Sequence, residues 1–236
     1  EKTALGFFLS GHLFDEYEAE VRQFVRTPVA ALEDSRETQR VAGIVSGLRS
    51  ANGPRGKVTI FTLDDKSGAI EAVADEALMA RCGQHIREDE LLVLSARYQP
   101  GRNGFEPRLS VQDALDLPSA RCAFGRWLKL DWQAPQQASN AQQPLQQLQA
   151  WLQAHQPAAH ASATEIQPPQ AEGDEAEPAR PRGVRLRIRL RCQGAQGQNA
   201  AAELLLPEAQ AIFPSEQALH ALRVHNGGAG VQMVYP

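Results

Sequence analysis

The sequence is poor in several features that mark whole classes of protein. No apolar run reaches the length of about 18 residues that spans a bilayer, and no signal peptide leads the chain, so we expect no membrane partner and a cytoplasmic location. The three cysteines form no CxxC pair, which suits a reducing compartment and argues against a disulfide framework or a zinc site. Because the net charge is −4, nucleic-acid binding would need a local basic patch.

Catalytic signatures are also missing. We find no phosphate-binding Walker loop, dinucleotide fingerprint or nucleophile elbow, and the six histidines show no metal-ligand spacing. Asp64 and Asp65 could bind Mg²⁺ as a carboxylate pair, but the run Asp-Asp-Lys-Ser-Gly is typical of a turn. We therefore expect no catalytic residue, no metal and no cofactor in this segment. The first residue is Glu1 rather than Met, from which we expect a fragment or a processed chain.

The 236 residues, 42% of them hydrophobic, are enough for one or two globular domains. Residues 1–38 form an N-terminal helical segment, because apolar side chains recur at helical spacing through residue 26. Ser10 and Gly11 suggest a break between two helices, and Pro28 ends the segment.

Residues 40–118 show the pattern of a five-stranded barrel. Strands are predicted at 41–49, 58–64, 69–74, 90–98 and 105–111, with a short helix at 76–82. Five strands with a helix after the third is the order of an OB-fold, in which residues 50–57 and 99–104 would be loops beside the ligand face. Five-stranded barrels of other topology would give a similar pattern.

Residues 124–236 predict a small α+β tail domain. The predicted order is β-α-β-β-α-β, of the split βαβ type, and Ser215 is a candidate N-cap for the second helix. Residues 156–182 are rich in proline and acidic residues and read as a disordered linker or a long surface loop.

Basic residues gather around the two predicted barrel loops and the turn after the second strand. If these loops converge on one face, they could neutralise the phosphates of a single strand. The alternative is that they are solvated hairpin tips that bind nothing. The candidate nucleic-acid-binding residues are Arg49, Arg55, Lys57, Lys66, Arg97, Arg102 and Arg108.

Aromatic residues near the loops give less guidance. Phe61 alternates with Leu63 and is expected to fill the barrel, whereas Tyr98 and Phe105 could either stack on a base or belong to the core.

A strand of alternating arginines is the most unusual feature of the tail. Arg185, Arg187, Arg189 and Arg191 would share one strand face, where like charges repel unless something negative covers them. Acidic linker residues, a partner protein or nucleic acid could do so; we favour an intramolecular or protein partner, because the acidic run at 172–177 lies close in sequence.

Two stretches carry a family resemblance. "EKTALGFFLSGH" and "VAGIVSGLRSANGPRGKVTIFTLDDKSGAIEAV" resemble the C-terminal part of the bacterial DNA polymerase III alpha subunit, a C-family replicative polymerase. Leu13 departs from the proline that is usual in the family. The closing segment "PSEQALHALRVHNGGAGVQMVYP" is similar to the alpha subunit's small tail domain.

The resemblance implies a non-catalytic part of a polymerase whose barrel contacts single-stranded template DNA. It also implies that the tail docks the clamp-loader tau subunit, and that a motif upstream of this segment binds the sliding clamp. Mg²⁺ would serve the parent polymerase, whose palm aspartates are not in this sequence. Residues around the last helix and strand are the partner-binding candidates by resemblance alone: Leu219, Leu222, Val224 and Val234.

Two other functions fit parts of the sequence. The phrase "TLDDKSGAIE" also resembles the anticodon-binding OB domains of class II aminoacyl-tRNA synthetases, which would make the ligand RNA. The chain could instead be a pure protein-interaction module.

Overall fold

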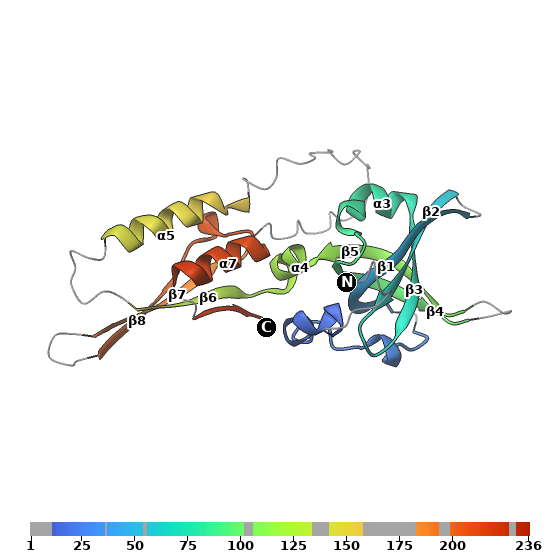
Figure 1. The fold of residues 1–236 in the computed structure, drawn as a ribbon, viewed down its shortest axis with the longest axis horizontal. Helices are drawn as coiled ribbons and strands as arrows, with labels where there is room; N and C mark the ends of the chain where they lie inside the picture. The colour runs from blue at the N-terminus through green and yellow to red at the C-terminus, as the bar shows by residue number, and fades with distance from the viewer. Residues whose placement is uncertain are drawn as a thin grey trace. The chain divides into compact units, whose positions relative to one another are not determined.

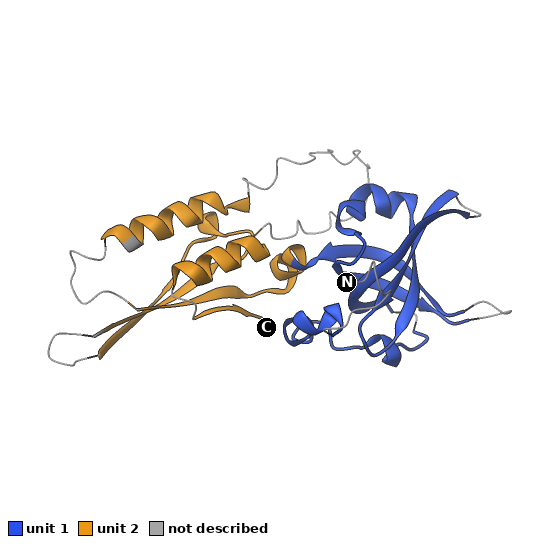
Figure 2. Cartoon of the chain, viewed as in Figure 1, with its two compact units in different colours: residues 1–117 blue, residues 118–236 orange. Residues whose placement is uncertain are grey.

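The computed structural model describes residues 11–35, 37–53, 56–101, 106–133, 142–157, 183–193, 199–226 and 230–236. The chain divides into two compact units, residues 1–117 and 118–236 (Figure 2). No helix among the described residues is both long and apolar enough to cross a membrane.

The described part of the N-terminal segment, residues 11–35, is helical in short pieces. Its elements are η1 (Leu13–Glu16), α2 (Glu18–Val21) and η2 (Val29–Ala31). His12 caps η1 through its imidazole, and the Asp15 carboxylate accepts the backbone N–H of His12, so Asp15 completes a capping box. Residues 1–10, which carry most of the first family stretch, lie outside the described residues.

The first unit is a closed five-stranded barrel, which confirms the OB-fold prediction (Figure 1). The strands are joined in the order β1-β2-β3-β5-β4, and helix α3 follows the third strand as predicted. The fifth strand begins and ends later than the sequence suggested. The bounds are β1 (Gln39–Gly53), β2 (Gly56–Asp64), β3 (Ala69–Asp75), α3 (Glu76–Cys82), η3 (Gly83–His85), β4 (Leu91–Gln99) and β5 (Arg108–Asp116).

Alternation along the strands builds the barrel core. Phe61 and Leu63 on β2, Leu92 and Leu94 on β4, and Leu109 on β5 are almost fully buried, so Phe61 fills the barrel as predicted. Thr62, between Phe61 and Leu63 on β2, is partly exposed, and outward positions of this kind form the surface on which a ligand could lie. Val93, between Leu92 and Leu94 on β4, is buried.

Strand β1 is bent by a bulge that the periodicity did not reveal. Its register against β2 shifts between Ser46 and Arg49, where Gly47 adopts a φ of +65°. The Glu88 carboxylate accepts the freed backbone N–H groups of Gly47 and Leu48 at 2.9 and 3.1 Å. The bulge sets which side chains of the β1–β2 hairpin face outward.

The second unit is a four-stranded sheet with helices along one side. Its strands lie in the order β8-β7-β6-β9 (Figure 1). The β-α-β-β-α-β succession is confirmed, but the split arrangement is wrong, because β6 and β7 are adjacent parallel partners with no strand between them. The bounds are α4 (Leu117–Phe124), β6 (Trp127–Gln133), α5 (Gln142–Ala154), β7 (Leu186–Gln193), β8 (Asn199–Leu205), η5 (Glu208–Gln210), α7 (Glu216–His225) and β9 (Val231–Val234).

The tail has its own core between the sheet and its helices. Leu128 and Leu130 of β6 are buried together with Leu148 of α5 and Leu222 of α7. Ser215 caps α7 by accepting the backbone N–H of Ala218, as predicted. Most of the predicted linker, residues 158–182, lies outside the described residues.

Candidate nucleic-acid interface

A continuous row of outward side chains crosses all five barrel strands. Arg49 on β1 is the register partner of Ile60 on β2, and Ile60 is the partner of Val73 on β3. Val73 pairs in turn with Ser110 on β5, and Ser110 with Arg97 on β4. The row, hereafter the outer row, therefore has an arginine at each end and partly exposed aliphatic side chains in the middle. Strand pairing thus links two predicted site residues, Arg49 and Arg97, that are 48 positions apart in sequence.

The charge of Arg49 is shared with an acidic neighbour. Nη2 of Arg49 lies 2.6 Å from Oε2 of Glu71, and the arginine side chain is 61% exposed. Glu71 is also the register partner of Arg108 across the parallel β3–β5 pair. The outer face therefore holds an acid between two arginines, which sequence reasoning did not anticipate because the pairing depends on strand register.

Of the other predicted site residues in the two barrel loops, the structure describes Lys57 and Arg108. Lys57 is exposed near the tip of the β1–β2 hairpin, on the opposite side of β2 from Ile60 by alternation, so it is not part of the outer row. Arg108 is exposed and donates from Nε to Oε1 of Gln99 at 2.9 Å. The predicted site residues Arg55 and Arg102 lie outside the described residues.

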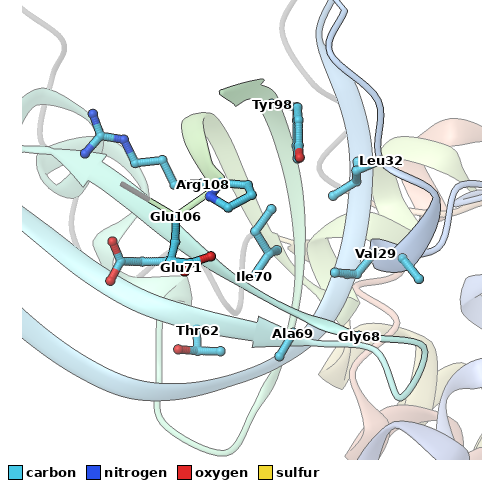
Figure 3. Close-up of a pocket in the computed structure, with 12 residues that line it drawn as sticks. Val29, Leu32, Thr62, Gly68, Ala69, Ile70, Glu71, Tyr98, Glu106 and Arg108 are labelled. Carbon is cyan, nitrogen blue, oxygen red and sulfur yellow. The ribbon is translucent and has the colours of Figure 1, made fainter. Parts of the chain in front are cut away.

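A groove of about 700 Å³ lies beside the outer row (Figure 3). One side is apolar, with Val29 and Leu32 from the N-terminal segment near Ile70 and Tyr98. The other side is polar and contains Thr62, Glu71, Glu106 and Arg108. Tyr98 packs against the barrel core and also lines this groove. Phe105 lies outside the described residues.

Lys66 has a different environment from the one we predicted. Its Nζ lies 2.6 Å from Oδ1 of Asp15 and 3.5 Å from Oε2 of Glu18, which are both in the N-terminal segment. The hydrogen bond to Asp15 raises the pKa of Lys66, and the same bond lowers the pKa of Asp15. The ammonium is therefore engaged by two carboxylates and attaches the N-terminal segment to the β2–β3 turn. None of the five residues of the outer row belongs to this turn.

The two turn aspartates have structural partners. Asp64 accepts the backbone N–H of Lys66 at 2.8 Å, and Asp65, which is 1% exposed, accepts the backbone N–H of Val29 at 3.0 Å. Within the described ranges, no three His, Cys, Asp or Glu side chains are grouped so that they could hold a metal ion. The sequence identified the turn but gave no sign that Asp65 is buried.

The partner-binding candidates of the tail fall into two groups. Leu219 and Leu222 are 1% and 0% exposed, so their side chains hold α7 against the tail core and cannot meet a partner directly. This corrects the prediction for both residues: in an amphipathic helix the spacing that suggests a docking stripe also produces a buried face. Val224 is 66% exposed on the other side of α7, and Val234 is half-buried on β9.

Comparison with known families agrees with this geometry. Residues 39–117, which contain the whole barrel, match the family described as OB-fold nucleic acid binding domain. The match covers the strands that carry the outer row.

The chain is similar to curated DNA polymerase III alpha subunits. The chain is 35% identical over 131 residues to the DNA polymerase III subunit alpha of Pseudomonas aeruginosa, covering 55% of this chain and 11% of that protein. It is 32% identical over 134 residues to the same subunit of Neisseria meningitidis serogroup B, covering 55% of this chain and 12% of that protein. The chain thus spans about a tenth of the length of these relatives. The resemblance inferred from the sequence is confirmed over the barrel region.

The likeness to solved structures is weaker than the likeness to these relatives. A replication protein A heterotrimer bound to ssDNA aligns with a TM-score of 0.31 and 19% identity, covering 38% of this chain and 24% of that one. At this score the likeness carries no further inference.

Proposed function

We propose that this chain, whose barrel region is related to the DNA polymerase III subunit alpha, binds single-stranded DNA as a non-catalytic part of a longer replicative polymerase subunit. The outer row carries this proposal, because Arg49 and Arg97 stand at its two ends and Ile60 and Val73 lie between them. Guanidinium groups suit phosphate oxygens, whereas exposed aliphatic side chains suit the faces of unpaired bases.

The groove supports the same function. An unstacked base could rest against Tyr98 and the apolar wall while its polar edge meets Glu71 or Arg108. The outward positions of β2 and β3 hold no aromatic side chain within the described residues 56–75. Base contacts along the row are therefore aliphatic, and we expect little sequence preference.

The test is a salt series of fluorescence-anisotropy titrations with a labelled oligodeoxynucleotide. Replacing both Arg49 and Arg97 by Ala should flatten the log–log salt slope by about 1.4, because each phosphate contact to a single strand contributes about 0.7. A matched control is Arg26→Ala with Arg87→Ala, which removes two exposed arginines from outside the outer row. Equal slopes for the two double variants would refute the placement of DNA on the outer row.

Competition decides between the two alternative functions. Stronger displacement by RNA than by DNA would favour an anticodon-type domain, and no binding even at low salt would favour a pure protein-interaction module.

The functions of the longer protein are further proposals that rest on the resemblance. The tail would dock the clamp-loader tau subunit, the sliding clamp would bind a motif upstream, and Mg²⁺ would serve nucleotide transfer elsewhere in the polymerase. A replicative role would also place the chain in the cytoplasm.

Docking of tau can be tested with the exposed candidate of the tail. Val224→Asp should weaken tau binding at least tenfold in a surface-plasmon-resonance assay, because it places a charge in an apolar contact. Leu145→Asp on α5 is the control, since Leu145 is also exposed and belongs to a different helix. Equal affinities for all three proteins would exclude Val224 from the tau interface.

A further inference from the structure

The tail presents a second basic surface that the barrel function does not use. In β6 and β7 the buried residues Leu128, Leu130, Leu186 and Ile188 alternate with partly exposed ones, and the buried set faces helices α5 and α7. Among the described residues of the tail, no helix covers the other face of the sheet. Its cationic side chains, with Arg126 at the edge, are Arg126, Lys129, Arg185, Arg187, Arg189 and Arg191; we call this surface the arginine face.

An aromatic ring organises one end of the arginine face. The guanidinium carbon of Arg126 lies 4.2 Å from the Trp127 ring centroid, and that of Arg187 lies 4.8 Å from it. A guanidinium over an indole ring is held by cation–π attraction and keeps its N–H groups free for other acceptors. The two planar cations are thus positioned before any ligand arrives.

Acidic neighbours neutralise only part of the charge. Glu203 on β8 pairs with both Arg187 and Arg189, and hydrogen bonds from Arg187 first and Arg189 second lower the pKa of Glu203. Asp131 lies 3.3 Å from Nζ of Lys129 and 3.9 Å from Nε of Arg189. Two carboxylates thus stand among six cations on this face within the described residues, in a chain whose overall charge is −4. Side chains of the tail itself, from strands β6 and β8, therefore neutralise part of the positive charge of the arginine face.

We propose that the arginine face is a second nucleic-acid-binding site, which takes the phosphodiester backbone of a strand along β7. Side chains two apart on a strand are spaced by about 6.6 Å, so successive arginines can each meet a phosphate of an extended strand. Arginine forms bidentate bonds with phosphate oxygens, and a base can stack on a guanidinium plane that Trp127 holds in place. An acidic peptide would neutralise the positive charge of the arginines, but it has no base that could stack on their guanidinium planes. This is why nucleic acid is the favoured occupant.

The experiment uses the full chain with Arg126 and Arg191 both replaced by Ala. Both residues are exposed, and neither is paired with Glu203 in the structure, so the arginine–glutamate pairs stay in place. Anisotropy titrations are made with a single-stranded oligonucleotide and with a duplex of the same sequence. The log–log salt slope of the variant should be flatter than that of the wild type by about 1.4 for the single strand and by about 1.8 for the duplex. A loss with only one of them would assign the site to that form of nucleic acid.

The matched control is Arg223→Ala together with Arg26→Ala, which removes two exposed arginines from outside the arginine face. Arg223 lies on α7, on the helix side of the tail, and Arg26 lies in the N-terminal segment. This control variant should keep a salt slope close to that of the wild type. Wild-type binding by the Arg126/Arg191 variant would overturn the proposal.

Two further arms separate this site from the barrel and from a protein ligand. The first arm adds Arg126→Ala and Arg191→Ala to the Arg49→Ala/Arg97→Ala variant. If the nucleic-acid binding that remains in the double variant is then lost, the arginine face is supported even if the barrel proposal fails. Polyglutamate is added as a competitor to the wild-type protein and its nucleic acid. If polyglutamate displaces the nucleic acid and the Arg126/Arg191 variant still binds nucleic acid as the wild type does, the proposal is overturned in favour of an acidic protein partner.

Discussion

Arg22 and Asp65, which are 43 residues apart in the sequence, are joined by a hydrogen bond of 2.9 Å from Nη2 of Arg22 to Oδ2 of Asp65. The bond connects the N-terminal segment to the β2–β3 turn of the barrel. Asp65 also accepts the backbone N–H groups of Val29 and Ser67. A single buried carboxylate therefore holds three parts of the first unit together.

The pH dependence of stability should report this carboxylate. Burial by itself would raise the pKa of Asp65, but hydrogen bonds from Ser67, Val29 and Arg22 outweigh it and hold the pKa below its ordinary value. Because the folded-state pKa is lowered, the contribution is fully present above the unfolded value of about 3.9 and is lost as pH falls through the folded value. In urea unfolding at pH 7, Asp65→Asn should cost about 1–3 kcal/mol.

The difference between wild type and Asp65→Asn should shrink in unfolding experiments below about pH 4. Asp34→Asn, at an exposed position, is the control and should show little effect at any pH. A cost for Asp65→Asn that does not change with pH would show that the ionised carboxylate is not the stabilising form.

Removal of the acid on the outer face should improve DNA binding. Glu71→Gln frees Arg49 from its 2.6 Å ion pair and removes a charge that repels phosphate. We expect binding of a single-stranded oligonucleotide to tighten by about threefold to tenfold at low salt. Glu208→Gln, at an exposed site of the tail, is the matched control in the same anisotropy assay. Weaker binding by Glu71→Gln would mean that the carboxylate itself contacts the ligand.

Gly43 is required by the close approach of β1 to β2. A Cβ at this position would lie 2.8 Å from the backbone oxygen of Asp64 and 2.9 Å from Cγ of Leu63. Gly43→Ala should therefore lower the free energy of unfolding by about 1–3 kcal/mol, since the strands must separate to admit the methyl group. The comparison is Gly68→Ala, where the nearest atoms would be 3.7 Å away, and thermal unfolding followed by circular dichroism measures both. Equal midpoints for the two variants would contradict the steric explanation.

Arg121 should stabilise the tail through the start of α7. Its side chain is 3% exposed, Nη1 donates to the backbone oxygen of Pro214 at 3.0 Å, and Nη2 lies 2.6 Å from Oε1 of Glu216. Arg121→Ala leaves the Pro214 oxygen without this donor and should cost about 1–3 kcal/mol in chemical unfolding of the tail. Glu216→Ala should cost less, because the glutamate is 55% exposed and its loss leaves the bond to Pro214 in place. The reverse order of costs would show that the ion pair, rather than the buried hydrogen bond, supports the helix.

Local patterns in the sequence determined the elements of both units. Alternation around Phe61 and Leu63 defines a strand with a buried side, and Ser215 before an amphipathic run defines a helix start. These features depend on residues a few positions apart, so they can be recognised without knowledge of the fold. The order of strands and helix in the barrel followed from them, and with it the OB-fold.

Only the tertiary structure decided which charges are available to a ligand. Arg49 and Arg97 become the two ends of the outer row because the bulge in β1 and the strand registers place them there. Lys66, equally basic in the sequence, is instead engaged by Asp15, and Leu219 is buried although it is part of a plausible docking stripe. Ion pairing, burial and register arise between residues that are far apart in the sequence. The sequence therefore determined what each segment becomes, whereas the packing of segments determined which side chains remain free to bind.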